Sequence, residues 1–416
     1  MSFAIDPVLL SRALPRRKRF DYALFLSCLA VAAFSLFMFH WEYGFENADL
    51  YTHARIASEF DFTDLHSITS RLAYPLWHVF VSALYQLGMP LVWASAVVCA
   101  ACKVAGMLLT HRMVRVLAGE DLSRGLVTLA AFLLMFVTGI CIPSINRYVY
   151  RPIGSPTVWH NPTQLAVIVT MLLCVPYTVH CWYAFARKRD AGEARPMLPW
   201  VKVVALAALL MLSLAAKPTF LQALIPAAAV FFLVEWARNP RHWRFFLQMI
   251  LAYLPSVLYF LLQYLYYTGV VVPYTSGVQI LITDVSLRET LRNVLMMNAF
   301  PLFAIVCCYR KGMFQDRQLV LCLLMLFVSA LEAMTFRETG MRDGHGNFFW
   351  AGMSVSLMLW IHMLSVYMRE AAAFLKAPRR PALRWAGYGA GLALMLWHFG
   401  SGFYYLYSIL SRGASF

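Results

Sequence analysis

Long apolar runs separated by short polar connections make up most of the chain. A helix needs about 20 apolar residues to cross a membrane. The apolar stretch 72–88 is shorter and contains Pro75 and His78, so we expect a re-entrant or interfacial helix there. The pattern predicts an all-α fold, a polytopic transmembrane helical bundle with short surface helices in the first long connection. Its eleven predicted spans lie at about residues 22–40, 91–111, 125–142, 163–184, 200–216, 219–236, 246–267, 293–309, 318–335, 347–367 and 385–409.

The composition agrees with this pattern, because only 13% of the 416 residues are charged and 61% are hydrophobic. A soluble domain carries about a quarter charged residues. No charge-rich block is long enough to form a separate soluble domain, so we predict a single membrane-embedded domain over residues 1–416. Cys99 and Cys102 form a CxxC pair inside an apolar run. Because no second ligand pair accompanies them, ordinary helix residues are favoured over a zinc or redox site.

The distribution of basic residues indicates the orientation. A basic segment, Arg16 to Arg19, precedes the first apolar run, and placing it in the cytoplasm puts most of the 35 Lys and Arg residues on that side. Counting 72–88 as a full span would put most of them outside. We therefore expect a multi-pass protein of the cell membrane, in a bacterial cytoplasmic membrane, with a cytoplasmic N-terminus. The net charge of +15 then reflects contact with anionic lipid headgroups and requires no nucleic acid partner.

The long connections all fall on the predicted outer side. They span residues 41–90, 143–162, 268–292 and 336–346, whereas the inner connections are short. Loops held by a rigid scaffold commonly carry function. We therefore expect the functional face to be the outer one.

The first outer connection contains the series Glu46, Asp49 and His53. If residues 46–59 form one helix, spacings of three and four residues place all three side chains on one face. A carboxylate beside an imidazole can act as a base and proton shuttle, or can bind a metal ion. The same spacing is also typical of a helix start, where acidic residues are favoured in the first turn.

The second outer connection carries Arg147 and Arg151 among aromatic residues, followed by Trp159, His160 and Asn161. Two arginines could hold a lipid phosphate or pyrophosphate through paired hydrogen bonds. The tryptophan could stack on a sugar ring or belong to the interfacial aromatic belt. Asn161 precedes a proline and is suited to cap the next span. His160 remains a candidate ligand.

Two lysines lie at unusual places. Lys217 separates two closely spaced spans, where it could extend to phosphate headgroups or neutralise a lipid-linked donor. Lys103 lies in the middle of a span, where it could pair across the bundle or extend toward water. The sequence leaves both alternatives open.

The fourth outer connection is the most polar. Residues 337–347 contain two arginines, two acids, one histidine and three glycines, and Arg337, Arg342 and His345 are the candidate ligand contacts. Glycines let the backbone approach a ligand, and the helix that follows presents its positive end. The phosphate of a polyprenyl carrier fits this connection, although a turn with self-cancelling ion pairs, each worth about 0–1 kcal/mol, is the alternative. Glu332 favours function, because an acid near a span end is costly unless it is paired or used.

Two segments after the first apolar run carry a resemblance. Residues 46–53 (ENADLYTH) and 74–78 (YPLWH) resemble the first extracytoplasmic loop of the GT-C superfamily of integral-membrane glycosyltransferases. The resemblance covers the topology of about the first third of the chain and, beyond it, only a helical bundle. In that superfamily this loop supplies a carboxylate that acts as base or organises the acceptor. Asp49 matches it here, with Glu46 second. A soluble C-terminal domain, which many members carry, is not evident, so acceptor recognition stays unexplained.

The hypothesis that follows is transfer of a sugar from a polyprenyl-phosphate-linked donor to a glycan, lipid or protein acceptor at the outer face. No nucleotide-binding signature is present, as expected where the activated sugar arrives on a lipid. A divalent metal is a candidate cofactor. The expected roles are Asp49 as base, Glu46 as its support or a metal ligand, His53 and His345 in proton transfer or sugar contact, and Arg337, Arg342, Arg151 and Lys217 at the leaving lipid phosphate.

Two other functions stay open. A transporter or flippase of lipid-linked sugars predicts charged residues along a path through the bilayer and internal repeats, of which only Lys103 is evident. A polysaccharide polymerase or ligase shares the outer arginines and histidines but not the early Asp49 motif.

Overall fold

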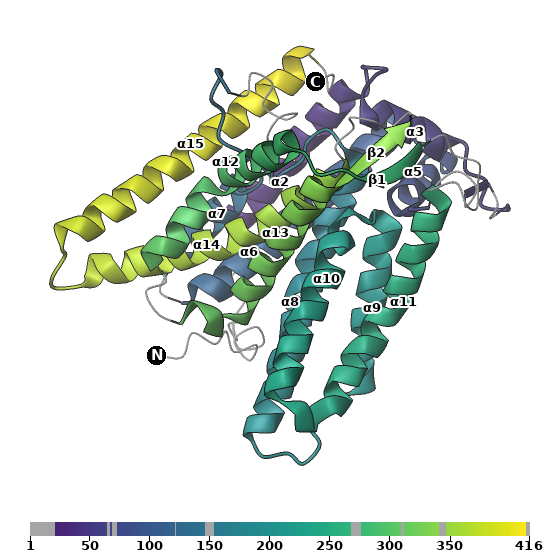
Figure 1. Ribbon diagram of the computed structural model, residues 1–416. Helices are drawn as coiled ribbons and strands as arrows, with labels where there is room; N and C mark the ends of the chain where they lie inside the picture. Colours follow the sequence, from purple (N-terminus) through teal and green to yellow (C-terminus); the bar gives the residue numbers. More distant parts are fainter. Residues whose placement is uncertain are drawn as a thin grey trace.

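The protein is a bundle of long helices, shown by a computed structural model in Figure 1. The structure describes residues 21–64, 67–68, 73–120, 122–145, 154–267, 276–308, 312–340 and 347–412. The first elements are α2 (Tyr22–Glu42), α3 (Asp49–Ser58), α5 (Leu76–Gln86), α6 (Leu91–Ala118), α7 (Arg124–Leu133), α8 (Pro162–Asp190), α9 (Trp200–Ala216) and α10 (Thr219–Arg238). They are followed by η1 (Pro240–His242), α11 (Trp243–Tyr267), β1 (Ser276–Ile280), α12 (Asp284–Cys308), η2 (Met313–Gln315), α13 (Arg317–Thr335), β2 (Phe336–Gly340), η3 (Asn347–Phe349), α14 (Trp350–Lys376) and α15 (Ala382–Arg412).

The predicted all-α membrane bundle is confirmed. Within the described residues, eight helices are long and apolar enough to cross a membrane, namely α2, α6, α8, α10, α11, α12, α13 and α14. The 17 residues of α9 and the 31 residues of α15 also coincide with predicted spans. The chain is therefore a multi-pass membrane protein, and every predicted span except 125–142 coincides with one long helix.

The apolar run 125–142 folds differently from the prediction. Its helix, α7, has ten residues and ends at Leu133, after which the chain is non-helical. Side chains from distant segments bind the freed carbonyl groups: Trp159 Nε1 donates to the oxygen of Met135 at 3.0 Å, and His398 Nδ1 lies 2.6 Å from that of Thr138. Non-helical backbone at membrane depth is tolerated only where it is buried in protein or lines water. The apolar sequence predicts that this segment is buried, but it does not predict which side chains bind its carbonyl groups.

The two short helices of the first connection are confirmed. The 11 residues of α5 extend for roughly 16 Å at 1.5 Å per residue, too short for a hydrocarbon core of about 30 Å. Helix α3 begins at Asp49, with Ala48 at its N-cap. Glu46 therefore lies before the helix and is exposed, so the expected helix over 46–59 with Glu46, Asp49 and His53 on one face is wrong. Ala48 has no side-chain acceptor, so the helix starts without a side-chain capping bond.

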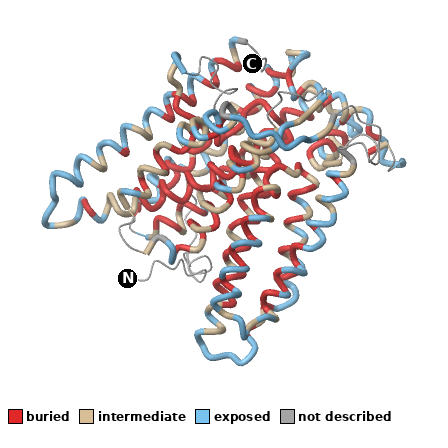
Figure 2. The backbone as a smooth tube through the Cα atoms, in the orientation of Figure 1, coloured by how far each residue is buried: buried red, intermediate tan, exposed pale blue. Residues whose placement is uncertain are grey.

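The centre of the bundle is α14. It is buried over 94% of its apolar window, the highest share among the eight candidate spans, and it contacts α6, α10, α12 and α13. Figure 2 shows the buried backbone concentrated in the middle of the bundle, with exposed backbone along α15 and at the α8–α9 connection. A helix that is apolar all round is expected at the centre of a bundle.

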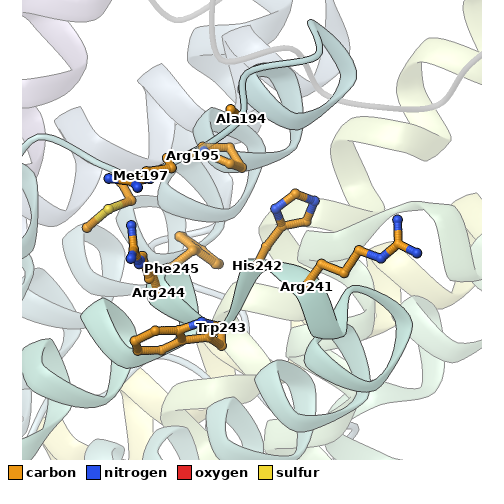
Figure 3. Close-up of a pocket in the computed structure, with 9 residues that line it drawn as sticks. Ala194, Arg195, Met197, Arg241, His242, Trp243, Arg244 and Phe245 are labelled. Atoms are coloured by element: carbon orange, nitrogen blue, oxygen red, sulfur yellow. The ribbon is translucent and has the colours of Figure 1, made fainter.

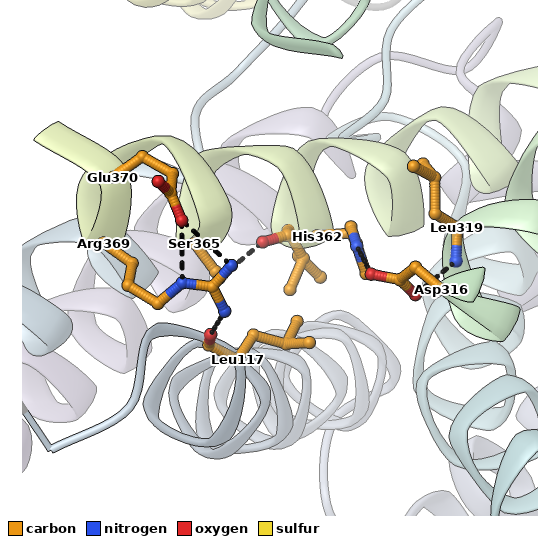
Figure 4. Close-up of polar contacts among 8 residues, drawn as sticks. Leu117, Asp316, Leu319, His362, Ser365, Arg369 and Glu370 are labelled. Carbon is orange, nitrogen blue, oxygen red and sulfur yellow. Dashed lines mark hydrogen bonds and ion pairs between the residues drawn. The ribbon is translucent and has the colours of Figure 1, made fainter. Parts of the chain in front are cut away.

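Polar contacts tie α14 to its neighbours (Figure 4). His362, near the middle of α14, lies 3.0 Å from Asp316 Oδ2, while Oδ1 of the same aspartate accepts the backbone N–H of Leu319 and caps α13. About two turns before the end of α14, Arg369 donates to the carbonyl oxygen of Leu117 in α6 at 3.1 Å. Buried polar groups are stable when they are paired in this way, and the pairs fix how α13 and α6 lie against α14.

Two distant connections form a small antiparallel sheet. Strands β1 and β2 pair with Ser276 opposite Gly340 and Gln279 opposite Arg337. The sequence predicted only loops at 268–292 and 336–346. Because two long helices, α12 and α13, separate the two strands in the sequence, no local sequence pattern predicts their pairing. Figure 1 shows the sheet at the same end of the bundle as α3 and α5.

A close helix contact supports the non-helical segment after α7. A Cβ atom added at Gly402 of α15 would lie 1.7 Å from the carbonyl oxygen of Phe136. We expect Gly402→Ala to lower the free energy of unfolding by about 1–3 kcal/mol, as overpacking does in tight cores. Gly400→Ala is the matched control, since nothing lies within 4 Å of its added Cβ, and we expect a change below about 1 kcal/mol. Thermal unfolding in detergent measures both, and equal melting temperatures would contradict the close contact.

Candidate functional site

Asp49 lies where the first and second connections meet. It is the first residue of α3, and its side chain is exposed. Asn161 Nδ2 donates to Asp49 Oδ2 at 2.7 Å, across 112 residues of sequence. This bond brings together two segments that the sequence analysis had singled out separately. It leaves the other carboxylate oxygen of Asp49 without a hydrogen bond to the described residues.

Asn161 is held in a single orientation. Its Oδ1 accepts the backbone N–H of Gln164 at 3.1 Å, which caps α8, and the hydroxyl of Thr163 at 2.9 Å. An amide oxygen that accepts two bonds directs the amide N–H groups the other way. The predicted cap is therefore confirmed, and the capping residue also positions the carboxylate of Asp49.

A pair of histidines lies behind Asp49. His53 Nδ1 is 2.9 Å from His78 Nε2, and His78 is fully buried on α5. Burial is the main cause that lowers the pKa of His53 to about 4; Lys217 acts in the same direction and the charge of Asp49 in the opposite one. The pKa of His78 is lowered by burial, by His53 and by Lys217. Both rings are therefore neutral at pH 7.

His160 lies on the second connection, next to Asn161. Its Nδ1 is 2.7 Å from the hydroxyl of Tyr405 on α15, and its ring centroid is 6.0 Å from that of Trp350. His160 is only 4% exposed. Burial lowers its pKa to about 4, with Lys217 and Lys103 acting in the same direction and Asp49 against it. The predicted ligand candidate is thus a neutral, buried imidazole.

Lys217 brings a positive charge into the same region. It follows α9, it is 8% exposed, and its ammonium nitrogen lies 4.7 Å from the centroid of the Trp350 ring. Lysines that extend to headgroups keep their charge in water. Burial against the tryptophan, together with the effect of Lys217 on His53 and His160, instead favours a charge directed into this region.

A hydrogen-bonded glutamine fixes the helices beneath these groups. Gln164 Nε2 donates to the hydroxyl of Ser354 on α14, and its Oε1 accepts from Thr219 Oγ1 on α10 at 3.1 Å. The three residues are buried. The starts of α8, α10 and α14 therefore form one rigid base, and it carries the segments of Asn161, Lys217 and Trp350.

Two further ionisable groups are buried inside the spans next to this region. Glu42, at the end of α2, is fully buried, and neither of its carboxylate oxygens has a hydrogen-bond partner among the described residues. It is close enough to Asp49 for the two acids to repel each other. Lys103 of α6 is 5% exposed, with its ammonium 3.6 Å from the centroid of the Trp159 ring. Lys103 therefore neither extends to water nor relies on an ion pair, and packs against an aromatic face.

We give the name Asp49 cluster to the groups that meet here: Asp49, His53, His78, His160, Asn161, Lys217, Trp350 and Tyr405. Four of the predicted or weighed residues, Asp49, His53, His160 and Lys217, are thereby brought together. Arg337 is exposed on β2, and Glu332 is half-buried in α13 with its Oε2 lacking a partner within the described ranges. Arg151, Arg342 and His345 lie outside the described residues.

Several members of the Asp49 cluster were not assigned from the sequence. Tyr405 lies in a uniformly apolar helix, and its partner is 245 residues away. His78 belongs to the segment YPLWH, and its position next to the acidic motif could have identified it as a candidate. Glu42 lies next to the cluster, and an acid at the end of an apolar run is a general indication of function.

Metal binding remains a prediction for Glu46 and its neighbours. In the part of the chain that the structure describes, no three His, Cys, Asp or Glu side chains come together as metal ligands do. Cys99 and Cys102 lie on α6 as helix residues. The Asp49 cluster itself presents one accessible carboxylate, neutral imidazoles and the buried amino group of Lys217.

The low pKa of the buried imidazoles predicts loss of stability in acid. Unfolded histidines bind protons below about pH 6.5, whereas His53 and His160 resist protonation until about pH 4, so stability is present above pH 6.5 and is lost as the pH falls toward 4. Each such group can contribute up to about 1.4 kcal/mol per pH unit in this window. We expect His160→Gln to reduce the change in melting temperature between pH 7 and pH 5. His40→Gln, at an exposed position, should leave it unchanged, and equal slopes in all three proteins would contradict the assignment.

Comparison with models of protein families and with curated proteins finds no match to this chain. The function is therefore argued from the geometry of the Asp49 cluster.

Proposed function

We propose that the protein is a membrane glycosyltransferase that transfers a sugar from a polyprenyl-phosphate-linked donor to an acceptor at the outer face of the membrane. The observation that carries this proposal is an accessible carboxylate, Asp49, held by Asn161 at a point where His160 and Lys217 also converge. Glycosyl transfer needs a base for the acceptor hydroxyl and positive charge for a departing phosphate. The Asp49 cluster offers both.

In the proposed reaction, the acceptor hydroxyl loses its proton to the free carboxylate oxygen of Asp49. The hydroxyl oxygen forms a bond to the anomeric carbon, and the bond from that carbon to the phosphate oxygen breaks. The phosphate leaves with the electron pair. Asn161 keeps Asp49 in position by donating to its other oxygen, and the proton then leaves the exposed Asp49 for water. Because its pKa is low, His53 is proposed to contact the sugar rather than to take up the proton.

Lys217 stabilises the charge that develops on the departing phosphate. Arg337 is the second candidate, because Glu338 beside it accepts a hydrogen bond from Asn347 at 2.6 Å, at the start of the segment that leads to Trp350. Arg342 and Arg151 retain the same predicted role. Glu46 lies exposed before α3, so the proposal relies on Asn161 rather than on Glu46 to support Asp49.

The remaining parts of the proposal follow from the membrane setting. The likeness of residues 46–53 to the GT-C superfamily supports transfer chemistry at this loop. The distribution of basic residues supports a cytoplasmic N-terminus in a bacterial cytoplasmic membrane, which places the Asp49 cluster outside. There the acceptor is a glycan of the cell envelope, a lipid or a protein.

Movement of a lipid-linked sugar between leaflets is the second candidate function. It is favoured by two buried ionisable groups beside the Asp49 cluster, Glu42 at the end of α2 and Lys103 within α6. Such groups commonly mark a path for polar or charged cargo. The two functions differ in whether a glycosidic bond forms.

The variant Asp49→Asn distinguishes sugar transfer from movement of a lipid-linked sugar between leaflets. Its amide oxygen still accepts from Asn161, so the fold is retained, while the loss of the base lowers transfer by about 10²–10⁴-fold. The assay supplies radiolabelled polyprenyl-phosphate sugars to the protein in vesicles and measures labelled glycoside. Glu59→Gln, an exposed acid just after α3, is the matched control and should transfer at the wild-type rate. Wild-type transfer by Asp49→Asn would refute the base, and leaflet movement without a new bond would establish the transporter.

A further inference from the structure

A basic cavity lies at the end of the bundle opposite the Asp49 cluster. Its volume is about 180 Å³, and it is enclosed by the α8–α9 connection and the start of α11. Figure 3 shows Arg195 and Met197 from the connection beside His242, Arg244 and Phe245. Helix α8 runs between the two regions, and its 29 residues span roughly 43 Å at 1.5 Å per residue.

The charge in this cavity is not balanced by acids. Arg195, Arg241 and Arg244 line it, and none of them makes an ion pair with any residue in the described ranges. Neighbouring basic residues are paired: Arg189 with Asp190 at 2.8 Å, Lys188 with Glu193 at 3.2 Å, and Arg238 with Glu235 at 2.9 Å. Figure 3 shows the side chain of Arg241 extending away from Arg195 and Arg244, so the unpaired guanidinium groups of Arg195 and Arg244 are the ones that favour an anion in the cavity.

The cavity is held in shape by hydrogen bonds. Gln248 of α11 binds both backbone groups of Leu198, accepting its N–H and donating to its carbonyl oxygen, each at 2.9 Å. Asn239, before η1, accepts from Arg189 at 2.8 Å and donates to the carbonyl oxygen of Glu235. Both walls are thus fixed without a ligand, which reduces the entropic cost of binding.

The surroundings of the cavity are those of a membrane boundary. Trp200 and Trp243 are exposed at the starts of α9 and α11, as in an interfacial aromatic belt. Beyond Trp243, α11 presents an exposed apolar face that includes Leu247, Ile250 and Leu254. A ligand in the cavity can therefore place a charged head among the arginines and apolar chains along α11.

We propose that this cavity binds a phosphate-bearing anion, either the headgroup of an anionic phospholipid whose chains lie along α11 or free phosphate. Planar guanidinium groups match the oxygens of a phosphate in paired hydrogen bonds. The first turn of α11 contains no acidic residue, so its backbone N–H groups add positive potential. The site is independent of glycosyl transfer, and its test requires no activity measurement.

The test is equilibrium binding of radiolabelled dioctanoyl phosphatidylglycerol to the detergent-solubilised full chain, compared with dioctanoyl phosphatidylcholine and with labelled inorganic phosphate. We expect saturable binding of the anionic lipid and none of the neutral lipid. The triple variant Arg195→Gln, Arg241→Gln, Arg244→Gln should raise the Kd by at least about tenfold. Saturable binding of inorganic phosphate with loss of affinity in the same variant supports the same site with free phosphate as its ligand.

The matched control removes three exposed arginines elsewhere, Arg124→Gln, Arg379→Gln and Arg384→Gln, and should change the Kd by less than about twofold. Thermal unfolding without ligand verifies that both triple variants fold. If the cavity variant does not fold, Arg195→Gln alone, at an exposed position in the α8–α9 connection, replaces it. Absence of saturable binding, or binding weakened equally by both triple variants, would overturn the proposal.

Discussion

The side chain of Asn161 performs two tasks at once, and the arrangement of the Asp49 cluster depends on both. Its oxygen caps the buried first turn of α8 by accepting the N–H of Gln164, while its nitrogen donates to Asp49. A capping bond stabilises a helix by about 0.5–2 kcal/mol. Here the same group determines where the carboxylate of Asp49 lies relative to α8, so local helix geometry and the geometry of the cluster are linked.

Charged groups are costly inside an apolar bundle, and three of those that are buried lie in or next to the Asp49 cluster. Glu42, Lys103 and Lys217 are each less than one-tenth exposed, at 0%, 5% and 8%. The two lysines pack against aromatic faces, at Trp159 and Trp350. An aromatic face attracts an ammonium group and so reduces the cost of burying it.

The general fold could be predicted from the sequence because the length of an apolar run is a local property. The same holds for the cap at Asn161 and for the short helices in the first connection. The residues Asp49, His53, His160 and Lys217 could be singled out because polar groups are rare in such a chain, but their convergence could not. It depends on contacts such as His160 with Tyr405, 245 residues apart. The prediction of a helix over residues 134–142 was wrong for the same reason. The hydrogen-bond partners of that segment, such as Trp159 and His398, lie farther along the chain.

The contact between that segment and α15 has a consequence for biogenesis. The carbonyl of Thr138 and the N–H of Cys141 are bound by His398 and Ser401, each 260 residues later in the chain. A ribosome extends a chain by about 5–20 residues per second. The segment therefore waits for roughly 13–50 s at these speeds before its partners are translated. During that interval these backbone groups need other hydrogen-bond partners, and they gain their final ones only when α15 is in place.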